Sequence, residues 1–416
     1  MNYCKRCLYP SNHPLYLTFD NEGVCSGCRV HEEKDILDWN ERARKLARIF
    51  DEYRNRSGAN YDCIIPVSGA KDSYFIVHTV KNVFKMNPLL VSYNKQYNTE
   101  IGIRNLAYLR TSFDCDFYQM TVSPETVKKV TRATLRKRGS IYWHCIAGQT
   151  VYPVQMAAKF KIPLIVWGAH QGVDQVGMFS HLDEVEMTRK YRKEHDLMGL
   201  EAEDLVDDFD FLGEQDLAPF FYPDDKELES VGVRGIYLNN YIRWDSKQQH
   251  EEMIRLYGYE TADQTRTFDR YNDIDCFNYS DLHDYIKFLK WGYGKVNDHV
   301  AREIRLKRLT ANQGAELIQQ YLYRKPQHLA KFLEWIGMSE RGFNFIIDQH
   351  RSSQVWERDG DWNWQRKAAF DQSLIDDSFD AVALEKKGAC EFVLTPSRNP
   401  AHKEDRYVLV GKGYVD

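Results

Sequence analysis

The sequence contains no apolar run approaching the ~18 residues that a membrane-spanning helix needs. The N-terminal segment Met1–Cys7 also lacks the apolar core of a secretory signal peptide. We therefore expect a cytoplasmic protein with no membrane partner. Basic charge is not in excess either, because the 416 residues carry a formal net charge of -5 and a pI of about 6.3. This balance gives no support to a broad nucleic-acid surface, and no nucleic-acid partner is expected.

Internal repeats and low-complexity tracts are absent, and nine cysteines in a long cytosolic chain do not indicate a disulfide framework. Four of the cysteines form two Cys-x-x-Cys pairs, Cys4 with Cys7 and Cys25 with Cys28. Such pairs straddle tight turns and suit a tetrahedral site with four sulfur ligands. Since sulfur fills every position and none is left for water, we predict structural zinc in a knuckle over residues 1–31. Free thiols or an iron–sulfur cluster are the alternatives.

Glycines and histidines surround these cysteines. Gly23 and Gly27 lie where the second turn is expected to need unusual backbone angles. His13 and His31 are expected at the surface, because four cysteines already complete a metal site.

Apolar strand patterns alternate with helical patterns along residues 57–280. The predicted strands cover 61–67, 89–93, 117–120 and 163–168, and the predicted helices cover 73–86, 100–111, 124–138 and 151–160. This alternation predicts an α/β fold with a doubly wound parallel sheet. Ligands of such sheets bind beyond the carboxyl ends of the strands, so the turns after them are expected along one edge.

Three further regions complete the predicted organisation. Residues 32–56 form a charged helical connector, and residues 281–416 form a mainly helical C-terminal region. The acidic insertion near 196–230 is expected to be a solvated surface segment, with a lid as the alternative.

The turn after the first strand is the most informative segment. The apolar run Ile64–Val67 leads into Ser68-Gly69-Ala70-Lys71-Asp72-Ser73, which opens onto a helix. A strand–turn–helix of this kind points backbone N–H groups at one spot and favours phosphate. The turn lacks the longer Gly-x-x-x-x-Gly-Lys pattern of a Walker loop. We therefore predict a nucleotide site of another type.

This segment resembles the Ser-Gly-Gly-x-Asp-Ser signature of the PP-loop ATP pyrophosphatases, which cleave ATP between the α and β phosphates and transfer AMP to a substrate oxygen. The resemblance implies that ATP and Mg²⁺ are used. Ser68 and Ser73 can donate hydroxyl hydrogen bonds, Lys71 adds positive charge, and Asp72 could hold the loop or Mg²⁺. The residues expected at ATP are Ser68, Gly69, Ala70, Lys71, Asp72, Ser73, Tyr93 and Gly168.

Ala70 departs from the signature, which prefers glycine there. If φ at this position were positive, alanine would cost of the order of 1 kcal/mol in strain. Its methyl group could also crowd the pyrophosphate. The chain is then either a weakened variant or a sequence that tolerates alanine.

More motifs follow in one order along the chain. They are Trp167-Gly168-Ala169-His170, Tyr241-Ile242-Arg243-Trp244-Asp245, Lys290-Trp291-Gly292-Tyr293-Gly294-Lys295-x-x-Asp298-His299, and Arg302-x-x-Ile304-Arg305-x-x-Arg308-Leu309-Thr310. With the cysteines and the loop, they resemble the N-acetyl sugar amidotransferases of bacterial surface-polysaccharide synthesis. The resemblance covers most of the chain, most weakly at 196–230 and after 355. It implies conversion of an N-acetyl group on a nucleotide-sugar or nonulosonic acid into an acetamidino group, in lipopolysaccharide, O-antigen or related glycan synthesis.

The implied reaction needs activation of an amide oxygen, because an amide carbonyl is a poor electrophile. Adenylation turns that oxygen into a leaving group, and ammonia then replaces it without a nucleophilic cysteine. The catalytic candidates are Lys71, Asp72, His170 and Asp174. The substrate-binding candidates are Trp291, Tyr293, Lys295, Asp298, His299, Arg302 and Arg305. The alternatives are a structural histidine at 170, a simple capped turn at 291–295 and a solvated basic face for the arginines.

The sequence shows no Gly-x-Cys-x-Gly elbow of a glutaminase. We therefore expect a separate glutaminase subunit together with an ammonia-channelling partner. The family pattern supports this, since it pairs such enzymes with proteins resembling the histidine-pathway glutaminase and cyclase.

Two other functions stay open at this point. A tRNA-modifying PP-loop enzyme would use Cys145 as a sulfur carrier and the basic helix 124–138 for RNA, although a buried cysteine acting as a small hydrophobe is favoured. A zinc-bearing scaffold that binds nucleotide without turnover is the third possibility, which Ala70 keeps open.

Overall fold

The computed structural model describes residues 2–367, apart from residues 16 and 207, and two short strands further on. Its centre is a five-stranded parallel sheet in the order β3-β2-β1-β4-β5. The strands are β1 (Cys63–Pro66), β2 (Pro88–Tyr93), β3 (Phe117–Met120), β4 (Leu164–Trp167) and β5 (Arg234–Tyr237). The predicted doubly wound parallel sheet is thus confirmed. The strand order reverses between β1 and β4, which is where ligands bind in sheets of this type.

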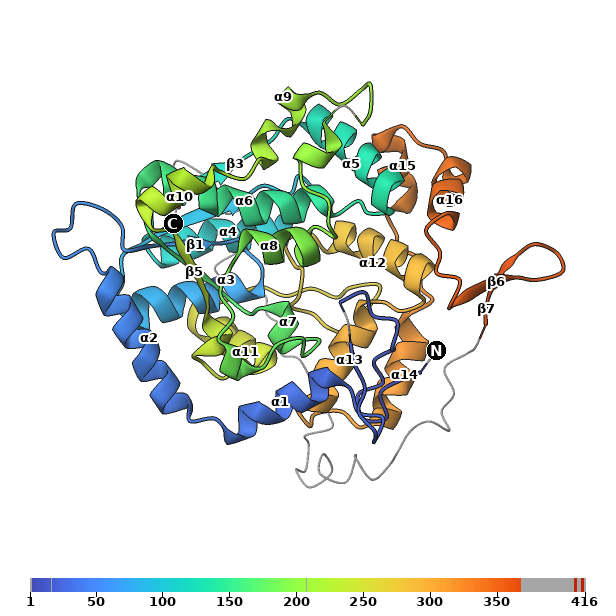
Figure 1. Ribbon diagram of the computed structural model, residues 1–416, viewed down its shortest axis with the longest axis horizontal. Coiled ribbons are helices and arrows are strands. Elements are labelled where there is room, and N and C mark those ends of the chain that lie inside the picture. Colours follow the sequence, from blue (N-terminus) through green and yellow to red (C-terminus); the bar gives the residue numbers. More distant parts are fainter. Residues whose placement is uncertain (1, 16, 207, 368–407, 410–412, 415–416) are drawn as a thin grey trace.

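Successive strand residues face two different hydrophobic layers. Ile64 of β1 packs with residues of α6 (Trp143–Phe160) on one face. Its neighbours Cys63 and Ile65 pack on the other face. The helices of that second layer include α2 (Trp39–Tyr53), α3 (Lys71–Val77) and α11 (Ser246–Tyr257). Burial of both faces explains why β1, β2 and β4 are nearly continuous apolar runs, and Figure 1 shows the sheet lying between these helices.

The other helices and turns of residues 57–280 are short, except for α4 and α5. They are α4 (Glu100–Ser112), α5 (Pro124–Arg138), α7 (Gln171–Asp174), α8 (Arg189–Tyr191), α9 (Glu214–Leu217) and α10 (Asp225–Val231), with π-helical turns at His78–Val83 and Arg192–Asp196 and 3-10 turns at His181–Asp183, Glu203–Leu205, Ala218–Phe220 and Leu238–Asn240. The helix expected at 73–86 is therefore α3 followed by a π-helical turn.

Helix α6 begins at Trp143, well before the predicted start at residue 151. Gly148 lies inside the helix. A Cβ there would lie only 2.4 Å from the Tyr93 ring, so the glycine makes room for β2 rather than ending the helix.

The charged segment after the cysteines is not one connector. It forms α1 (Ser26–Ile36) and α2, separated at Leu37, whose backbone is extended. Since α1 already contains Cys28, the metal segment and this helix are continuous.

The acidic segment 196–230 is more than a solvated insertion. Its apolar side chains pack into a hydrophobic cluster with α5 and α6. Some of its acidic residues pair with basic ones: Asp216 contacts Lys129 at 3.0 Å, and Asp208 pairs with Lys137. The local composition showed only the charge, whereas Leu197, Leu200 and Leu217 provide the packing.

The C-terminal part is mainly helical as far as residue 348. It comprises α12 (Phe277–Trp291), α13 (Lys295–Arg305), α14 (Ala311–Tyr321), α15 (Leu329–Ile336) and α16 (Glu340–Asp348), the hairpin β6 (Trp356–Arg358) and β7 (Trp364–Arg366), and the pair β8 (Val408–Leu409) and β9 (Gly413–Tyr414). Within the described residues, no helix is both long and apolar enough to cross a bilayer.

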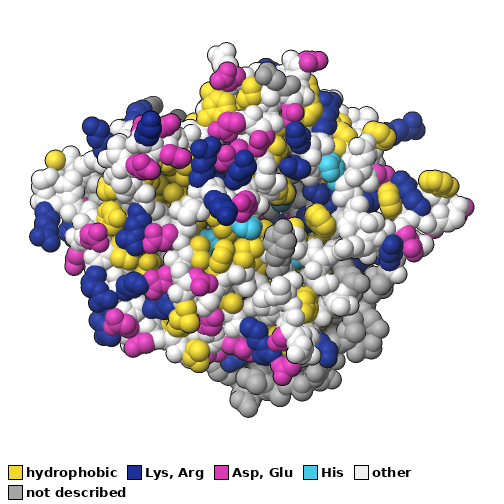
Figure 2. Space-filling view, in the orientation of Figure 1, with side chains coloured by type: hydrophobic (Ala, Val, Ile, Leu, Met, Phe, Trp, Pro, Cys, Tyr) yellow, Lys and Arg dark blue, Asp and Glu magenta, His cyan; other side chains and the backbone are white. Residues whose placement is uncertain are grey.

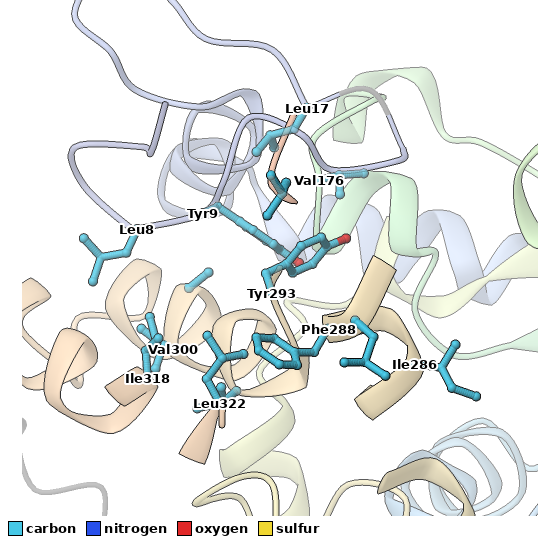
Figure 3. Close-up of a cluster of buried hydrophobic side chains, with 14 of the residues drawn as sticks. Leu8, Tyr9, Leu17, Val176, Ile286, Phe288, Tyr293, Val300, Ile318 and Leu322 are labelled. Carbon is cyan, nitrogen blue, oxygen red and sulfur yellow. The ribbon is translucent and has the colours of Figure 1, made fainter. Parts of the chain in front are cut away.

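The N-terminal metal segment packs against these C-terminal helices. Figure 3 shows Leu8, Tyr9 and Leu17 beside Tyr293 and Val300 in one buried cluster. The N-terminal segment and the C-terminal helices therefore build a common core, which local sequence patterns do not reveal.

Candidate functional site

The small residues of the turn after β1 hold the turn in shape. The backbone N–H of Ser68 donates to Ser73 Oγ at 3.0 Å, and the N–H of Ala70 donates to Ser68 Oγ at 3.3 Å. Gly69 has a φ of 78°, and a Cβ there would lie 2.9 Å from Leu106 Cβ. Both the backbone conformation and the close approach of α4 therefore require glycine at position 69.

Ala70 is not strained. Its φ is -80° and its ψ is 178°, which is extended backbone open to any residue. The positive φ belongs to Gly69 instead. The possible strain cost of alanine at position 70 is therefore absent.

A cavity of about 320 Å³ lies beyond the carboxyl ends of β1 and β4. Its wall combines the turns after β1, β4 and β5 with α13. The lining residues are Lys71, Asp72, Ala169, Gln171, Asp174, Gln175, Trp244, Ser246, Asn272, Asp273, Lys295, Asp298, His299, Arg302 and Arg305. The cavity thus occupies the ligand position expected for this sheet order. It brings together eight of the predicted site residues, from Lys71 to Arg305.

The sheet side of the cavity carries Lys71, Asp72 and Asp174. Lys71 Nζ donates to Asp72 Oδ1 at 2.8 Å and to Ser246 Oγ at 3.1 Å. Asp174 accepts from Lys34, whose Nζ also donates to the carbonyl of Trp244 at 3.1 Å. Burial raises the pKa of Asp174, but the charges of Lys34 and Lys71 outweigh it, so the net pKa lies below its usual value. Asp174 is therefore a carboxylate at neutral pH.

The opposite side is formed by α13, and its charged groups are already paired. Lys295 contacts Asp281 at 2.7 Å, and Asp298 contacts Lys287 at 2.7 Å. Arg302 donates to Asp269 at 2.7 Å. These pairs leave a charged but rigid wall, in place of the solvated basic face that was the alternative.

His299 on the same helix is neutral. Burial lowers its pKa to about 4. Its Nδ1 lies 2.7 Å from Thr267 Oγ1, and its Nε2 lies 3.3 Å from Asn272 Nδ2. With the amide of Asn272 as donor to Nε2, the proton is on Nδ1 and points to Thr267.

Several predicted residues lie outside the lining. Those in or beside the turn after β1 and at the strand ends are Ser68, Gly69, Ala70, Ser73, Tyr93 and Gly168, and those elsewhere are His170, Trp291 and Tyr293. Tyr93 is buried, with its hydroxyl 3.2 Å from His144 Nδ1. His170 is buried against Tyr191 and Tyr237, at ring-centroid distances of 4.3 and 4.7 Å.

Trp291 and Tyr293 belong to the interface with the metal segment. The carbonyl of Trp291 accepts from Asn12 Nδ2 at 2.8 Å. The Tyr293 ring lies 5.4 Å from the His13 ring. Their surroundings are those of packing residues.

Sequence reasoning missed Ser246, Asn272 and Asp273 in the lining. Ser246 follows directly after the Trp244-Asp245 motif, which was a signal available in the sequence. Asp273 has a φ of 53°, a conformation that aspartate adopts more readily than most residues. It accepts from Ser280 Oγ at 2.7 Å, at the start of the C-terminal helices.

The four cysteines meet as predicted. Their sulfur atoms all lie within 4.8 Å of one another and are buried. Cys4 and Cys28 are 3.9 Å apart, and Cys7 and Cys25 are 3.5 Å apart. A tetrahedron with Zn–S bonds of about 2.3 Å places its sulfur atoms roughly 3.8 Å apart, so the donor set fits zinc.

Two expectations around this centre were wrong. His13 and His31 are each only 8% exposed, since the C-terminal helices cover the segment. Gly23 has the expected positive φ of 78°, but Gly27 does not, because α1 begins at Ser26. At Gly27 the requirement is for space, as a Cβ would lie 2.4 Å from an Arg305 nitrogen.

The C-terminal part of the chain is similar to a known protein family. Residues 265–369 match the family described as LPS biosynthesis protein WbpG-like, C-terminal domain. This match contains α13 and its cavity residues, and it bears out the resemblance to proteins of bacterial surface-polysaccharide synthesis.

Other similarities are more distant. The chain is 24% identical over 116 residues to the uncharacterized protein MJ1599 of Methanocaldococcus jannaschii, covering 27% of this chain and 40% of that protein. It therefore spans less than half of that relative. NMN synthetase from Francisella tularensis aligns with 13% identity and a TM-score of 0.26, over 51% of this chain and 96% of that one. NH3-dependent NAD synthetase from Campylobacter jejuni aligns with 12% identity and a TM-score of 0.28, over 73% and 98%.

Proposed function

We propose that this protein is an ATP-dependent carbon–nitrogen ligase that converts the N-acetyl group of a nucleotide-linked sugar into an acetamidino group. The observation that supports this most is the shared cavity. It joins Lys71 and Asp72 of the ATP-type turn to Lys295, Asp298 and Arg302 of α13. The name of the matched family, which refers to LPS biosynthesis, supports a glycan substrate for the domain that carries α13.

In the proposed reaction the acetyl oxygen attacks the α-phosphorus of ATP and pyrophosphate leaves. Ammonia then adds to the imidate carbon, and AMP departs with the former acetyl oxygen. The products are an amidine, AMP and pyrophosphate. The Lys71 ammonium group would stabilise the negative charge on the departing pyrophosphate.

Carboxylates in the cavity suit Mg²⁺. This ion is usually held by one or two carboxylates together with substrate phosphates. Asp72 and Asp174 would hold it, and its chemistry there is to neutralise phosphate charge. Asp174 fits this task because its pKa is lowered and it remains ionised.

Ammonia is proposed to come from a separate glutaminase subunit through a channelling partner. The purified chain is then expected to use ammonium salts and to be inactive with glutamine alone. Activity of this chain with glutamine would contradict the partner proposal while leaving the ligase proposal intact.

The test is mass spectrometry of nucleotide-linked N-acetyl sugars incubated with the protein, ATP, Mg²⁺ and ammonium. A decrease of one dalton in the acceptor, with release of AMP and pyrophosphate, is the expected result. ATP binding without product across such a panel would instead favour the non-catalytic scaffold.

The tRNA-modifying alternative is less well supported. Cys145 is fully buried, and burial raises the pKa of its thiol well above the ordinary value. Of the basic residues on α5, Lys129 and Lys137 are paired with the acidic segment. Figure 2 also shows basic and acidic side chains interspersed over the visible face. Cys145→Ala is expected to retain amidination, and loss of a thiolation product in this variant would reverse the choice.

A further inference from the structure

Arg305 connects the metal centre to the cavity. One of its terminal nitrogens lies 3.4 Å from Cys25 Sγ and 3.5 Å from Cys7 Sγ, while the same residue lines the cavity. Its other terminal nitrogen donates to the carbonyl of Gln175, a second lining residue. The guanidinium therefore contacts the sulfur ligands and the cavity wall at once.

The contact between Arg305 and the sulfur atoms is electrostatically favourable. Four thiolates around Zn²⁺ carry a net charge of -2, and burying such a charge is costly without a compensating partner. Arg305 is only 7% exposed and donates to two of the four sulfurs. Outer-shell donors of this kind orient metal ligands and tune metal affinity.

The surrounding chain is shaped to admit this guanidinium. At Gly27 a Cβ would lie 2.4 Å from an Arg305 nitrogen and 2.8 Å from the carbonyl oxygen of Gln175. The backbone of α1 is helical here, so only the missing side chain explains the glycine. A larger residue at this position would displace the guanidinium from the sulfur atoms.

Two further residues, Tyr9 and Lys34, connect the N-terminal segment to the cavity. Tyr9 donates its hydroxyl to Asp298 and accepts from Gln175 Nε2 at 2.6 Å. Lys34 of α1 pairs with Asp174. Asp298, Gln175 and Asp174 all line the cavity.

We propose that Arg305 is a positioning residue that couples the four-cysteine metal centre to the cavity, so that metal retention and ligand binding reinforce each other. This gives Arg305 a role different from direct contact with the sugar. It also places the N-terminal segment directly behind the cavity, in contact with its lining residues. The coupling to ligand rests on the proposed binding of ATP in this cavity, whereas the contact with the metal centre does not.

The experiment compares zinc release to a chromogenic chelator in the wild type, Arg305→Lys and Gly27→Ala, with and without saturating Mg-ATP. Loss of an outer-shell partner typically weakens metal binding about 10–100-fold, so both variants are expected to release zinc at least tenfold faster. Mg-ATP is expected to slow release in the wild type and to lose this effect in both variants. The matched control is Gly213→Ala, since a Cβ there meets nothing within 4 Å and its φ of -95° is ordinary.

The results distinguish the contact of Arg305 with the metal centre from the coupling of that centre to ATP binding. Unchanged zinc release in both variants would overturn the role of Arg305. Faster release in the variants, with wild-type protein that does not bind ATP, would retain the contact with the metal but refute the proposed function and the coupling. If Arg305→Lys fails to fold, Gly27→Ala tests the same contact without replacing the guanidinium. The absorption of the Co²⁺-substituted protein adds a direct readout, because displacement of the guanidinium should shift its sulfur-to-metal bands in Gly27→Ala but not in Gly213→Ala.

Discussion

The two walls of the cavity hold their charges in different ways. On the sheet side, Asp174 has a distant partner in Lys34, but Lys71 in the turn after β1 pairs with its own neighbour Asp72, and these two side chains are 15% and 37% exposed. On the α13 side, Arg302 pairs with Asp269, a fully buried residue from another segment. A charged group held by a partner from a distant segment is fixed before a ligand binds. The Lys71 ammonium group, paired with its own neighbour, can exchange that partner for a phosphate. The difference suggests that α13 sets the shape of the site and the loop supplies the movable charge.

Removing the metal is expected to have the largest effect, because α13 depends on the N-terminal segment. Structural zinc contributes roughly 10–16 kcal/mol of binding free energy in small domains. We expect Cys25→Ser to lose zinc and to lower the thermal unfolding midpoint by more than about 10 °C. Elemental analysis and calorimetry measure both. Cys115→Ser, outside the metal centre, is the control, and an unaltered midpoint in Cys25→Ser would contradict a structural role.

Replacing Lys71 in the turn after β1 should have the opposite effect to removing the metal: activity is lost and stability is kept. Lys71→Met removes the ammonium group proposed to stabilise charge on pyrophosphate. Loss of one such interaction typically costs about 10²–10³-fold in rate, so kcat should fall by that factor. The free energy of unfolding should stay within ~0.5 kcal/mol, as for other partly exposed positions. Lys226→Met on α10 is the matched control. A Lys71→Met protein with full activity would exclude the proposed role.

Acid should destabilise the fold through His250, which is buried in α11. Burial lowers the pKa of His250 to about 3, against 6.5 for an exposed histidine. Since the unfolded chain takes up a proton that the folded state does not, stability falls as pH decreases from about 6 to 4, by ~1.4 kcal/mol per pH unit for this residue. His250→Phe keeps the ring that stacks on Tyr271 and should reduce this slope. Denaturant titrations at several pH values measure it, and equal slopes in both proteins would refute the prediction.

Ala70→Gly is expected to have the smallest effect. The φ of -80° means that no strain is relieved, while glycine adds freedom to the unfolded chain. A loss of about 0.5–1 kcal/mol in unfolding free energy is therefore expected, without a large gain in activity. Chemical denaturation and ATP turnover check this together. A large increase in ATP turnover in Ala70→Gly would show that the Ala70 methyl group, and not the backbone conformation, limits the activity of the wild-type protein.

The sequence was sufficient for features that depend on local pattern. The apolar runs predicted β1 to β4 to within two residues at each end, and the spacing of the cysteines predicted the four-sulfur cluster. The short strand β5 was missed, since Arg234 and Gly235 interrupt its apolar pattern. Partners far apart in sequence were also missed. Nothing local to Asp269 shows that it fixes Arg302, and nothing near Gly27 shows that it makes room for a side chain of α13.

The long separation between Cys7 and Arg305, which are 298 positions apart, has a consequence for biogenesis. During translation the four thiolates emerge first, whereas Arg305, the cation that contacts two of them, follows 280 positions after Cys25. The nascent protein must therefore complete the cavity after most of the polypeptide has left the ribosome. A chain that stops before α13 would lack the contacts of Asp298 with Tyr9 and of Arg305 with the sulfur cluster.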